Sequence, residues 1–196
     1  MRVLGRLRAK YEKTMVPVGK VLAGTGLSPN TMTIASLFVA IASAYFYAID
    51  MAPWGALLIV ATGVFDMFDG AIARATGKTS RFGATLDHVT DRYAEYFILV
   101  GMIYGGYTPW YWGLFTLFGM LMASFTRAKA ESVGGLERCT VGIAERQEKL
   151  IILIGGSLIH GYVGEALNYA VIIVGVLSHI TMAQRLHYTW TQIKGE

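Results

Sequence analysis

Long apolar runs that lack any charged residue recur along this chain. A helix needs about 20 residues to cross the hydrocarbon core of a bilayer. Runs close to that length occupy Thr31–Ile49, Leu150–Gly164 and Ala166–Gln184. Another begins at Met51 and continues as a helical pattern through two aspartates toward Ala75. Each of these four runs predicts one membrane-spanning helix.

The apolar run Tyr96–Thr126 is too long for a single span. Its centre reads "GGYTPW", and Gly and Pro at that point favour a turn. The run therefore predicts two helices, of which the first reaches back to about Arg81. The total is six transmembrane helices in an all-α membrane protein, with residues 28–193 forming the bundle.

Lys and Arg concentrate at alternate ends of the predicted spans. Apart from Arg92, they occur before residue 21, within 74–81, within 127–149 and after residue 184. The opposite turns, around Asp50, Thr108 and Glu165, contain neither. Cytoplasmic loops carry the excess of Lys and Arg, so both termini are expected in the cytoplasm, and the protein in the cell membrane.

Residues 1–24 combine basic residues with apolar positions at helical spacing. This pattern favours an amphipathic helix lying on the anionic inner leaflet, with a disordered basic tail as the alternative. Ser28 or Asn30 is a suitable N-cap for the first span. The length suits one domain, expected to cover 1–196. Only 15% of the residues are charged, against about a quarter in soluble domains, which points to the bilayer, and nucleic-acid binding is not expected. Cys139 is the only cysteine and is expected to be inert.

Four aspartates interrupt these apolar segments, at Asp66, Asp69, Asp87 and Asp91. An Asp at the centre of a membrane helix costs about 2.5–3.5 kcal/mol on insertion scales. At about 100° per residue, the first two lie roughly 60° apart on one helix and the last two roughly 40° apart on the next. If these helices are antiparallel neighbours joined by "ATGKTSR", all four carboxylates converge near the cytoplasmic end.

Four neighbouring carboxylates repel one another unless cations compensate them. Hard divalent cations such as Mg²⁺ or Mn²⁺ prefer oxygen ligands and frequently bind substrate phosphates as well. The small residues Gly70, Ala73 and Gly83 leave room for a ligand, and Arg74 and Arg81 add charge suited to phosphate. This pattern predicts a site for a metal-bound pyrophosphate. Interhelical salt bridges and an ion pathway are the two alternatives that the spacing alone leaves open.

The spacing of these residues resembles the signature of the CDP-alcohol phosphotransferases at every position. That signature reads here Asp66-x2-Asp69-Gly70-x2-Ala73-Arg74-x8-Gly83-x3-Asp87-x3-Asp91. The resemblance implies a six-helix membrane enzyme, usually a homodimer, that transfers a phosphate-bearing group from a CDP-activated alcohol to a second alcohol and releases CMP. It also implies two bound Mg²⁺ or Mn²⁺ ions, with the four aspartates as ligands and Asp91 as the general base.

The resemblance extends beyond the signature. "SPNTMT" is similar to the family segment beside the CDP-lipid, which adds Asn30 and Thr33 to the expected CDP-lipid site. The other residues expected there are Asp66, Asp69, Gly70, Ala73, Arg74, Ser80 and Gly83. "SFTRAKAE", "GIAERQEKLIIL" and "ITMAQRLHYTW" are similar to the branch that uses inositol phosphate as acceptor. Its phosphate-binding positions correspond to Arg127, Arg146 and Arg185, with Lys129 as an alternative to Arg127.

The function expected from this resemblance is transfer of a phosphatidyl-type group from CDP-diacylglycerol or CDP-archaeol to inositol phosphate. An acceptor that carries its own phosphate needs cationic ligands, which agrees with the three arginines. Glycerol 3-phosphate would need the same ligands and is the alternative acceptor. A divalent-cation transporter is the alternative from another class of protein.

Overall fold

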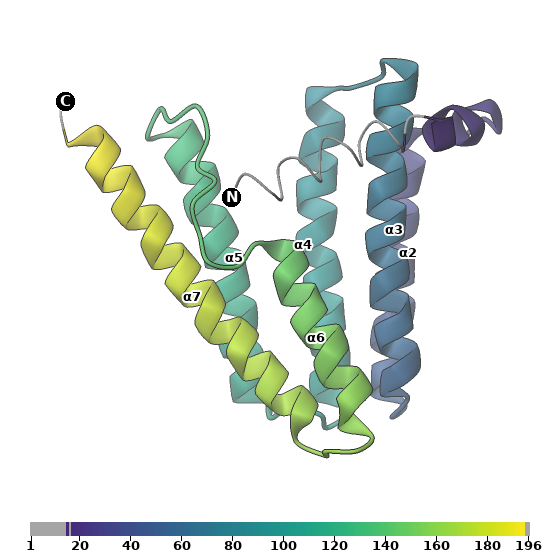
Figure 1. Cartoon of the computed structure of the whole chain (residues 1–196), viewed down its shortest axis with the longest axis vertical. Helices are drawn as coiled ribbons and strands as arrows, with labels where there is room; N and C mark the ends of the chain where they lie inside the picture. Colours follow the sequence, from purple (N-terminus) through teal and green to yellow (C-terminus); the bar gives the residue numbers. More distant parts are fainter. Residues whose placement is uncertain (1–14, 16, 195–196) are drawn as a thin grey trace. The chain divides into compact units, whose positions relative to one another are not determined.

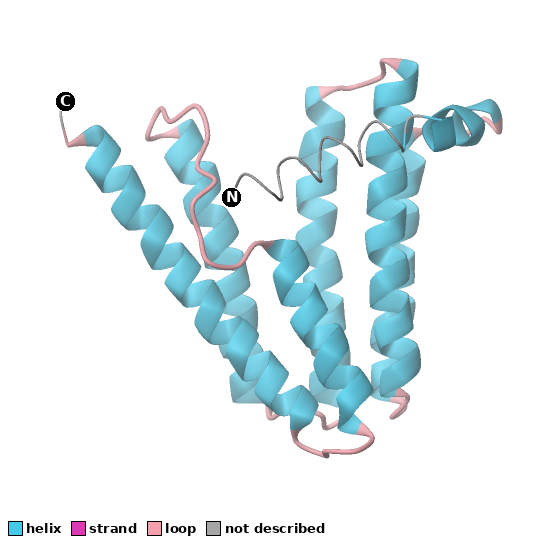
Figure 2. Cartoon of the chain, viewed as in Figure 1, coloured by secondary structure: helices cyan, strands magenta, loops and turns pink. Residues whose placement is uncertain are grey.

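The computed structural model describes residue 15 and residues 17–194, and every regular element among them is a helix (Figure 2). An all-α fold is therefore confirmed for that part of the chain. Residues 17–24 are helical. The six longer helices are labelled in Figure 1 and are α2 (Pro29–Ala48), α3 (Ala52–Thr76), α4 (Arg81–Tyr104), α5 (Trp110–Ser132), α6 (Arg146–His160) and α7 (Ala166–Ile193).

Helices α2, α3 and α7 are long and apolar enough to cross a membrane, which makes the chain a membrane protein. Helix α4 has a charged first half, with Asp87, Asp91 and Arg92. Helix α6 has 15 residues, so it is about 22 Å long, shorter than the roughly 30 Å hydrocarbon core. Length and composition thus identify three of the six predicted spans.

The chain forms two compact units. The first contains the described residues up to Ala42 together with Leu58–Phe97, and the second contains Ser43–Leu57 and the residues from Ile98 onward. Helices α2, α3 and α4 contribute residues to both units.

The first unit is built around the hairpin of α3 and α4, which Figure 1 shows joined by a short loop. Gly77 begins that loop at φ 66°, a conformation that glycine adopts without a steric penalty. Ser80 then caps α4, because its Oγ accepts a 2.9 Å hydrogen bond from the Gly83 N–H. The predicted antiparallel pairing of the two aspartate-bearing helices is confirmed.

The helical segment 17–24 contacts α3 within this unit. The predicted interfacial helix spans 1–24, and residues 1–14 and 16 lie outside the described part. In the helical segment 17–24, Gly19 packs against the main-chain carbonyl of Ala71, where a side chain would collide. This contact lies two residues from Asp69. Ser28 Oγ accepts a 3.1 Å hydrogen bond from the Thr31 N–H, which confirms Ser28 as the cap of α2.

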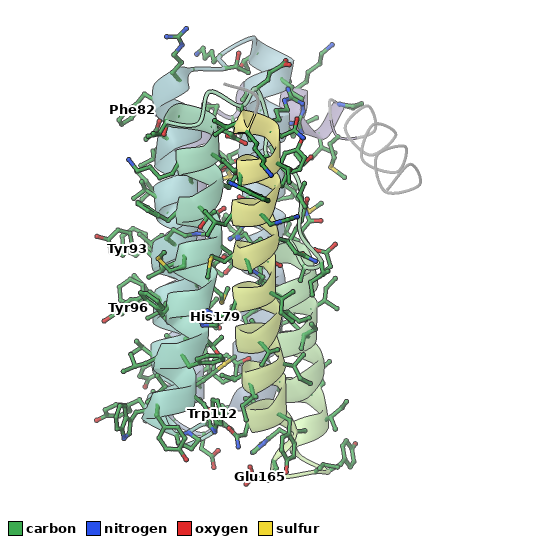
Figure 3. All side chains as sticks on the ribbon, turned by 90° about the vertical axis from the view of Figure 1, so that its left-hand side faces the viewer. Phe82, Tyr93, Tyr96, Trp112, Glu165 and His179 are labelled. Carbon is green, nitrogen blue, oxygen red and sulfur yellow. The ribbon has the colours of Figure 1, made fainter. Side chains whose placement is uncertain are left out.

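In the second unit, α7 packs against α5 and α6. His179 points from α7 toward α5, where its ring stacks on Phe115 at 4.4 Å between centroids (Figure 3). Its Nε2 also lies 3.2 Å from the Phe115 carbonyl oxygen. His179 therefore serves to join two helices.

The turns at Asp50 and Tyr107, also in the second unit, are held together by one phenol. Tyr107 donates a 2.8 Å hydrogen bond to Asp50 Oδ1 and accepts a 3.2 Å hydrogen bond from the Ala52 N–H. Burial of the hydroxyl, and its donation to the Asp50 carboxylate, raise the pKa of Tyr107 from its ordinary value of 10.0 to about 12. Asp50 has φ 61° and ends the turn after α2.

Candidate active site

Three of the predicted carboxylates come together in the first unit. Helix α3 supplies Asp66 and Asp69, and α4 supplies Asp87. One oxygen from each lies within 4.8 Å of the other two. Asp69 is only 8% exposed. The convergence that helical spacing predicted is therefore confirmed for these three side chains.

Asp91, the fourth predicted carboxylate, belongs to a second group. An oxygen of Asp91, an oxygen of Asp87 and a ring nitrogen of His88 lie within 4.8 Å of one another. Asp87 is common to both groups, so it stands between two clusters of potential ligand atoms. His88 was not among the predicted site residues. Its spacing of three residues from Asp91 was the signal that could have identified it, because residues three apart are neighbours on a helix surface.

The donor set of these two groups fits divalent cations. Oxygen ligands of one Mg²⁺ lie about 2.1 Å from the ion, which places neighbouring ligands roughly 3–4 Å apart. The ligand atoms of each group, within 4.8 Å of one another, are therefore close to the spacing that one ion requires. Four carboxylates favour Mg²⁺ or Mn²⁺, and the imidazole offers a nitrogen ligand beside them.

Thr33 orients the most buried of these carboxylates. Its hydroxyl donates a 2.7 Å hydrogen bond to Asp69 Oδ2, and the Thr33 side chain is itself buried. Hydrogen bonds of this kind fix the direction in which a metal ligand presents its remaining lone pairs. Thr33, a predicted CDP-lipid residue, thus has the structural role of orienting the Asp69 carboxylate.

The other predicted CDP-lipid residues in the first unit form two small groups. The guanidinium of Arg74 folds back over Gly70, where an added Cβ would lie 3.0 Å from Nη1. At the start of α4, an added Cβ on Gly83 would lie 3.0 Å from Ser80 Oγ and 3.3 Å from Asn30 Oδ1. Each glycine therefore leaves a space beside it, and polar groups of neighbouring residues line that space.

Ala73, the last residue of the predicted CDP-lipid set, is half-buried on α3, one turn beyond Asp69. A methyl group at this position adds little bulk to the face that carries the carboxylates. The structure therefore places all the predicted CDP-lipid residues in the first unit.

The predicted acceptor residues lie in the second unit. Arg185 on α7 is only 6% exposed, and it donates from Nε to the Val141 carbonyl at 2.9 Å and from Nη1 to the Ala123 carbonyl at 2.7 Å. Two of its donors therefore hold the main chain. Arg127 on α5 donates from Nε to Glu131 Oε1 at 3.1 Å. Arg146 is the first residue of α6.

Lys129 and Lys149 occupy contrasting environments in this unit. The Lys129 ammonium lies 5.6 Å from the ring centroid of Phe125, and both side chains are exposed. Lys149 lies one turn after Arg146 and is only 5% exposed. Sequence reasoning used Lys149 for topology alone. Its spacing of three residues from Arg146 was available as a signal, whereas its burial depends on tertiary packing.

Comparisons with known proteins agree with this geometry. Residues 27–183 match the family model described as CDP-alcohol phosphatidyltransferase. The chain is 38% identical to the archaetidylinositol phosphate synthase of Pyrococcus horikoshii, over 94% of this chain and 95% of that protein.

Solved structures of a phosphatidylinositol phosphate synthase from Mycobacterium tuberculosis are also similar. The form with CDP-DAG bound has a TM-score of 0.82 and 30% identity, covering 91% of this chain and 94% of that one. The form in complex with manganese and citrate has a TM-score of 0.82 and 31% identity, covering 90% and 89%. A manganese ion bound by a relative of the same fold supports the fit of the donor set described above.

Proposed function

This chain belongs to the CDP-alcohol phosphatidyltransferase family, and from that premise we propose that it transfers a lipid phosphate group from a CDP-activated lipid to inositol phosphate. The reaction releases CMP. The observation that carries the proposal is the pair of ligand groups on α3 and α4, which share Asp87. The four aspartates of these groups are the acidic positions of the family signature in the sequence.

The four aspartates hold the divalent cations, Mg²⁺ or Mn²⁺, in this proposal. When bound, such cations supply positive charge to the pyrophosphate of the CDP-lipid and to the CMP leaving group. Thr33 keeps the Asp69 carboxylate in a fixed orientation. Arg74 and the polar groups of Asn30 and Ser80, beside Gly70 and Gly83, border the space for the CDP moiety.

Asp91 acts as the general base. A hydroxyl of inositol phosphate attacks the β-phosphorus of the CDP-lipid, and its proton passes to the Asp91 carboxylate. The new P–O bond forms as the bond from that phosphorus to the CMP oxygen breaks. Positioning and charge compensation are the main sources of acceleration in phosphoryl transfer.

Arg127, Arg146 and Arg185 bind the phosphate of the acceptor. The relatives named above are synthases of archaetidylinositol phosphate and phosphatidylinositol phosphate, which supports an acceptor of this class. Between the two candidates on α5, the side-chain contacts support Arg127, because Glu131 holds its guanidinium. Lys129 instead lies over the exposed ring of Phe125.

The arrangement in the membrane is the remaining part of the proposal. All six helices cross the bilayer, with both termini and the active site on the cytoplasmic side of the cell membrane, and two copies form a homodimer. The alternation of Lys and Arg between the connecting segments supports this orientation. The apolar length of α2, α3 and α7 supports their spans directly.

Release of CMP by the purified chain tests the enzymatic proposal. The reactions contain CDP-diacylglycerol or CDP-archaeol, Mg²⁺ or Mn²⁺, and inositol phosphate, glycerol 3-phosphate or no acceptor. The Asp66→Asn variant is the control for contaminating activity. We expect CMP to be released only in the reactions that contain inositol phosphate as acceptor. CMP with glycerol 3-phosphate and none with inositol phosphate would overturn the acceptor assignment, and no CMP with any acceptor from folded protein would overturn the enzymatic proposal.

A further inference from the structure

The segment 133–145 connects α5 to α6 without regular structure, and it returns along α5 before α6 begins (Figure 2). Main-chain N–H and C=O groups in a membrane protein need partners wherever water is excluded. Much of this segment finds them in side chains of α5 and α7. The contacts all lie within the second unit.

Helix α7 holds the second half of the segment. Arg185 donates to the Val141 carbonyl at 2.9 Å, and Gln184 accepts from the Ile143 N–H at 3.0 Å. The Thr181 hydroxyl lies 3.4 Å from both the N and the O of Ala144. Helix α6 begins at Arg146, directly after this segment. These contacts therefore help to fix the position of Arg146.

Helix α5 holds the first half of the segment through one carboxylate. Glu131 Oε1 accepts a hydrogen bond from the Cys139 N–H at 2.9 Å and also accepts from Arg127 Nε at 3.1 Å. Cys139 is fully buried. One oxygen atom of Glu131 therefore joins the Arg127 guanidinium on α5 to the main chain at Cys139, eight residues after Glu131.

We propose that Glu131 is a positioning residue for acceptor binding: its carboxylate holds the Arg127 guanidinium and the main chain at Cys139 in one fixed arrangement. The inference rests on the proposed function, because it assumes that Arg127 contacts the acceptor phosphate. The contact engages Nε of Arg127, and the two terminal nitrogens are the ones that form a fork with a phosphate end-on. Holding Nε fixes the plane and direction of that fork.

The arrangement also links the predicted acceptor residues to one another. Arg185 donates a hydrogen bond to the segment at Val141, and Glu131 accepts one from it at Cys139. Arg146 is the first residue after the segment. A displacement of the segment would therefore disturb Arg146 as well as Arg127. A positioning residue of this kind affects acceptor binding more than CDP-lipid binding.

Cys139 provides a reporter that needs no substrate. It is the only cysteine of the chain, and it is buried within the segment that Glu131 anchors. Labelling of the wild-type holoenzyme by a maleimide in detergent should be slow. In Glu131→Ala we expect the labelling rate to rise about tenfold or more, because the Cys139 N–H loses its acceptor and the segment opens more often.

Two further variants complete the labelling experiment. Glu131→Gln keeps an oxygen acceptor for the Cys139 N–H and should label at nearly the wild-type rate, which also preserves a test if Glu131→Ala does not fold. Glu137→Ala removes the same charge from an exposed position in the same segment. It should also label slowly. Equal labelling of wild type and Glu131→Ala would overturn the anchoring role.

Steady-state kinetics test the second half of the inference. In Glu131→Ala the KM for inositol phosphate should rise about tenfold, while the KM for the CDP-lipid stays within about twofold. In the background of Arg127→Ala, removing Glu131 should raise the acceptor KM by a smaller factor than in the wild-type background, because the part of its effect that acts through Arg127 is already lost. Equal rises in both KM values would overturn the positioning role. If no acceptor supports turnover, the proposed function fails, and the labelling result still decides whether Glu131 anchors the segment.

Discussion

Thr33 Oγ1 and Asp69 Oδ2 are joined by a 2.7 Å hydrogen bond that connects α2 to α3. Both side chains are buried, at 3% and 8% exposure. The carboxylate therefore has one oxygen committed to a hydroxyl donor from a neighbouring helix. Through this contact, a threonine near the start of α2 orients a carboxylate of the ligand group that α3 and α4 form.

Replacing Thr33 with Ala should weaken Mn²⁺ binding by about 10- to 100-fold, the usual loss when an outer hydrogen bond to a metal ligand is removed. Thr33→Ser keeps the hydroxyl and should bind nearly as well as wild type. A Mn²⁺ titration followed by electron paramagnetic resonance measures the free ion directly. Equal affinities for Thr33→Ala and Thr33→Ser would contradict the orienting role.

Asp91→Asn should lower kcat by about 10²–10⁴-fold, because the amide cannot take the proton of the attacking hydroxyl. Single-turnover measurement of CMP formation separates this chemical step from product release. The control is CDP-lipid binding, which we expect to remain measurable, because Asp66, Asp69 and Asp87 still form a ligand group. Turnover near the wild-type rate would remove Asp91 as the base.

Arg127→Ala should raise the KM for inositol phosphate by about tenfold or more, the cost of losing a charge-assisted contact to phosphate. Lys129→Ala removes the same charge two residues away and should change that KM by less than about twofold, since exposed cations contribute little. The matched pair is compared at saturating CDP-lipid. A larger effect for Lys129 would reverse the assignment made from the Glu131 contact.

Tyr107→Phe should lower the free energy of unfolding by about 1–2 kcal/mol near neutral pH, because Asp50 Oδ1 loses its donor and the Ala52 N–H its acceptor. The pKa of Tyr107 is raised from 10.0 to about 12 in the fold. Its contribution is therefore complete below pH 10 and is lost as the pH rises through 12. Thermal unfolding of both proteins in detergent should show a difference that shrinks over this interval; a widening difference would contradict this account.

Much of the first unit could be predicted from local sequence. Helical spacing placed Asp66, Asp69 and Asp87 on facing stripes, and the turn at Gly77 allowed their helices to pair. Residue type and position gave Ser28 and Asn30 as the two candidate caps of α2, and Ser28 is the one that accepts the hydrogen bond. Such features depend on contacts within one or two turns, where residue spacing and side-chain chemistry determine the geometry.

The features that sequence reasoning missed depend on contacts between distant residues. His88 was not among the predicted site residues, and its approach to a ligand atom of Asp91 depends on the side-chain conformations in the folded protein. The burial of Lys149 and the two main-chain acceptors of Arg185 arise from packing with other segments. The Glu131 contact with Cys139 joins positions eight residues apart through a segment that follows no helical period. No periodic pattern records such a contact.

The identity of the lipid product tests the central claim most directly. The purified chain is given a CDP-activated lipid and Mn²⁺ or Mg²⁺, with equal concentrations of inositol phosphate and glycerol 3-phosphate competing in one reaction. Mass spectrometry of the extracted lipids then identifies which headgroup has been attached. The account predicts a lipid that carries inositol phosphate as the dominant product. A lipid that carries only glycerol phosphate, or the absence of any new lipid, would contradict it.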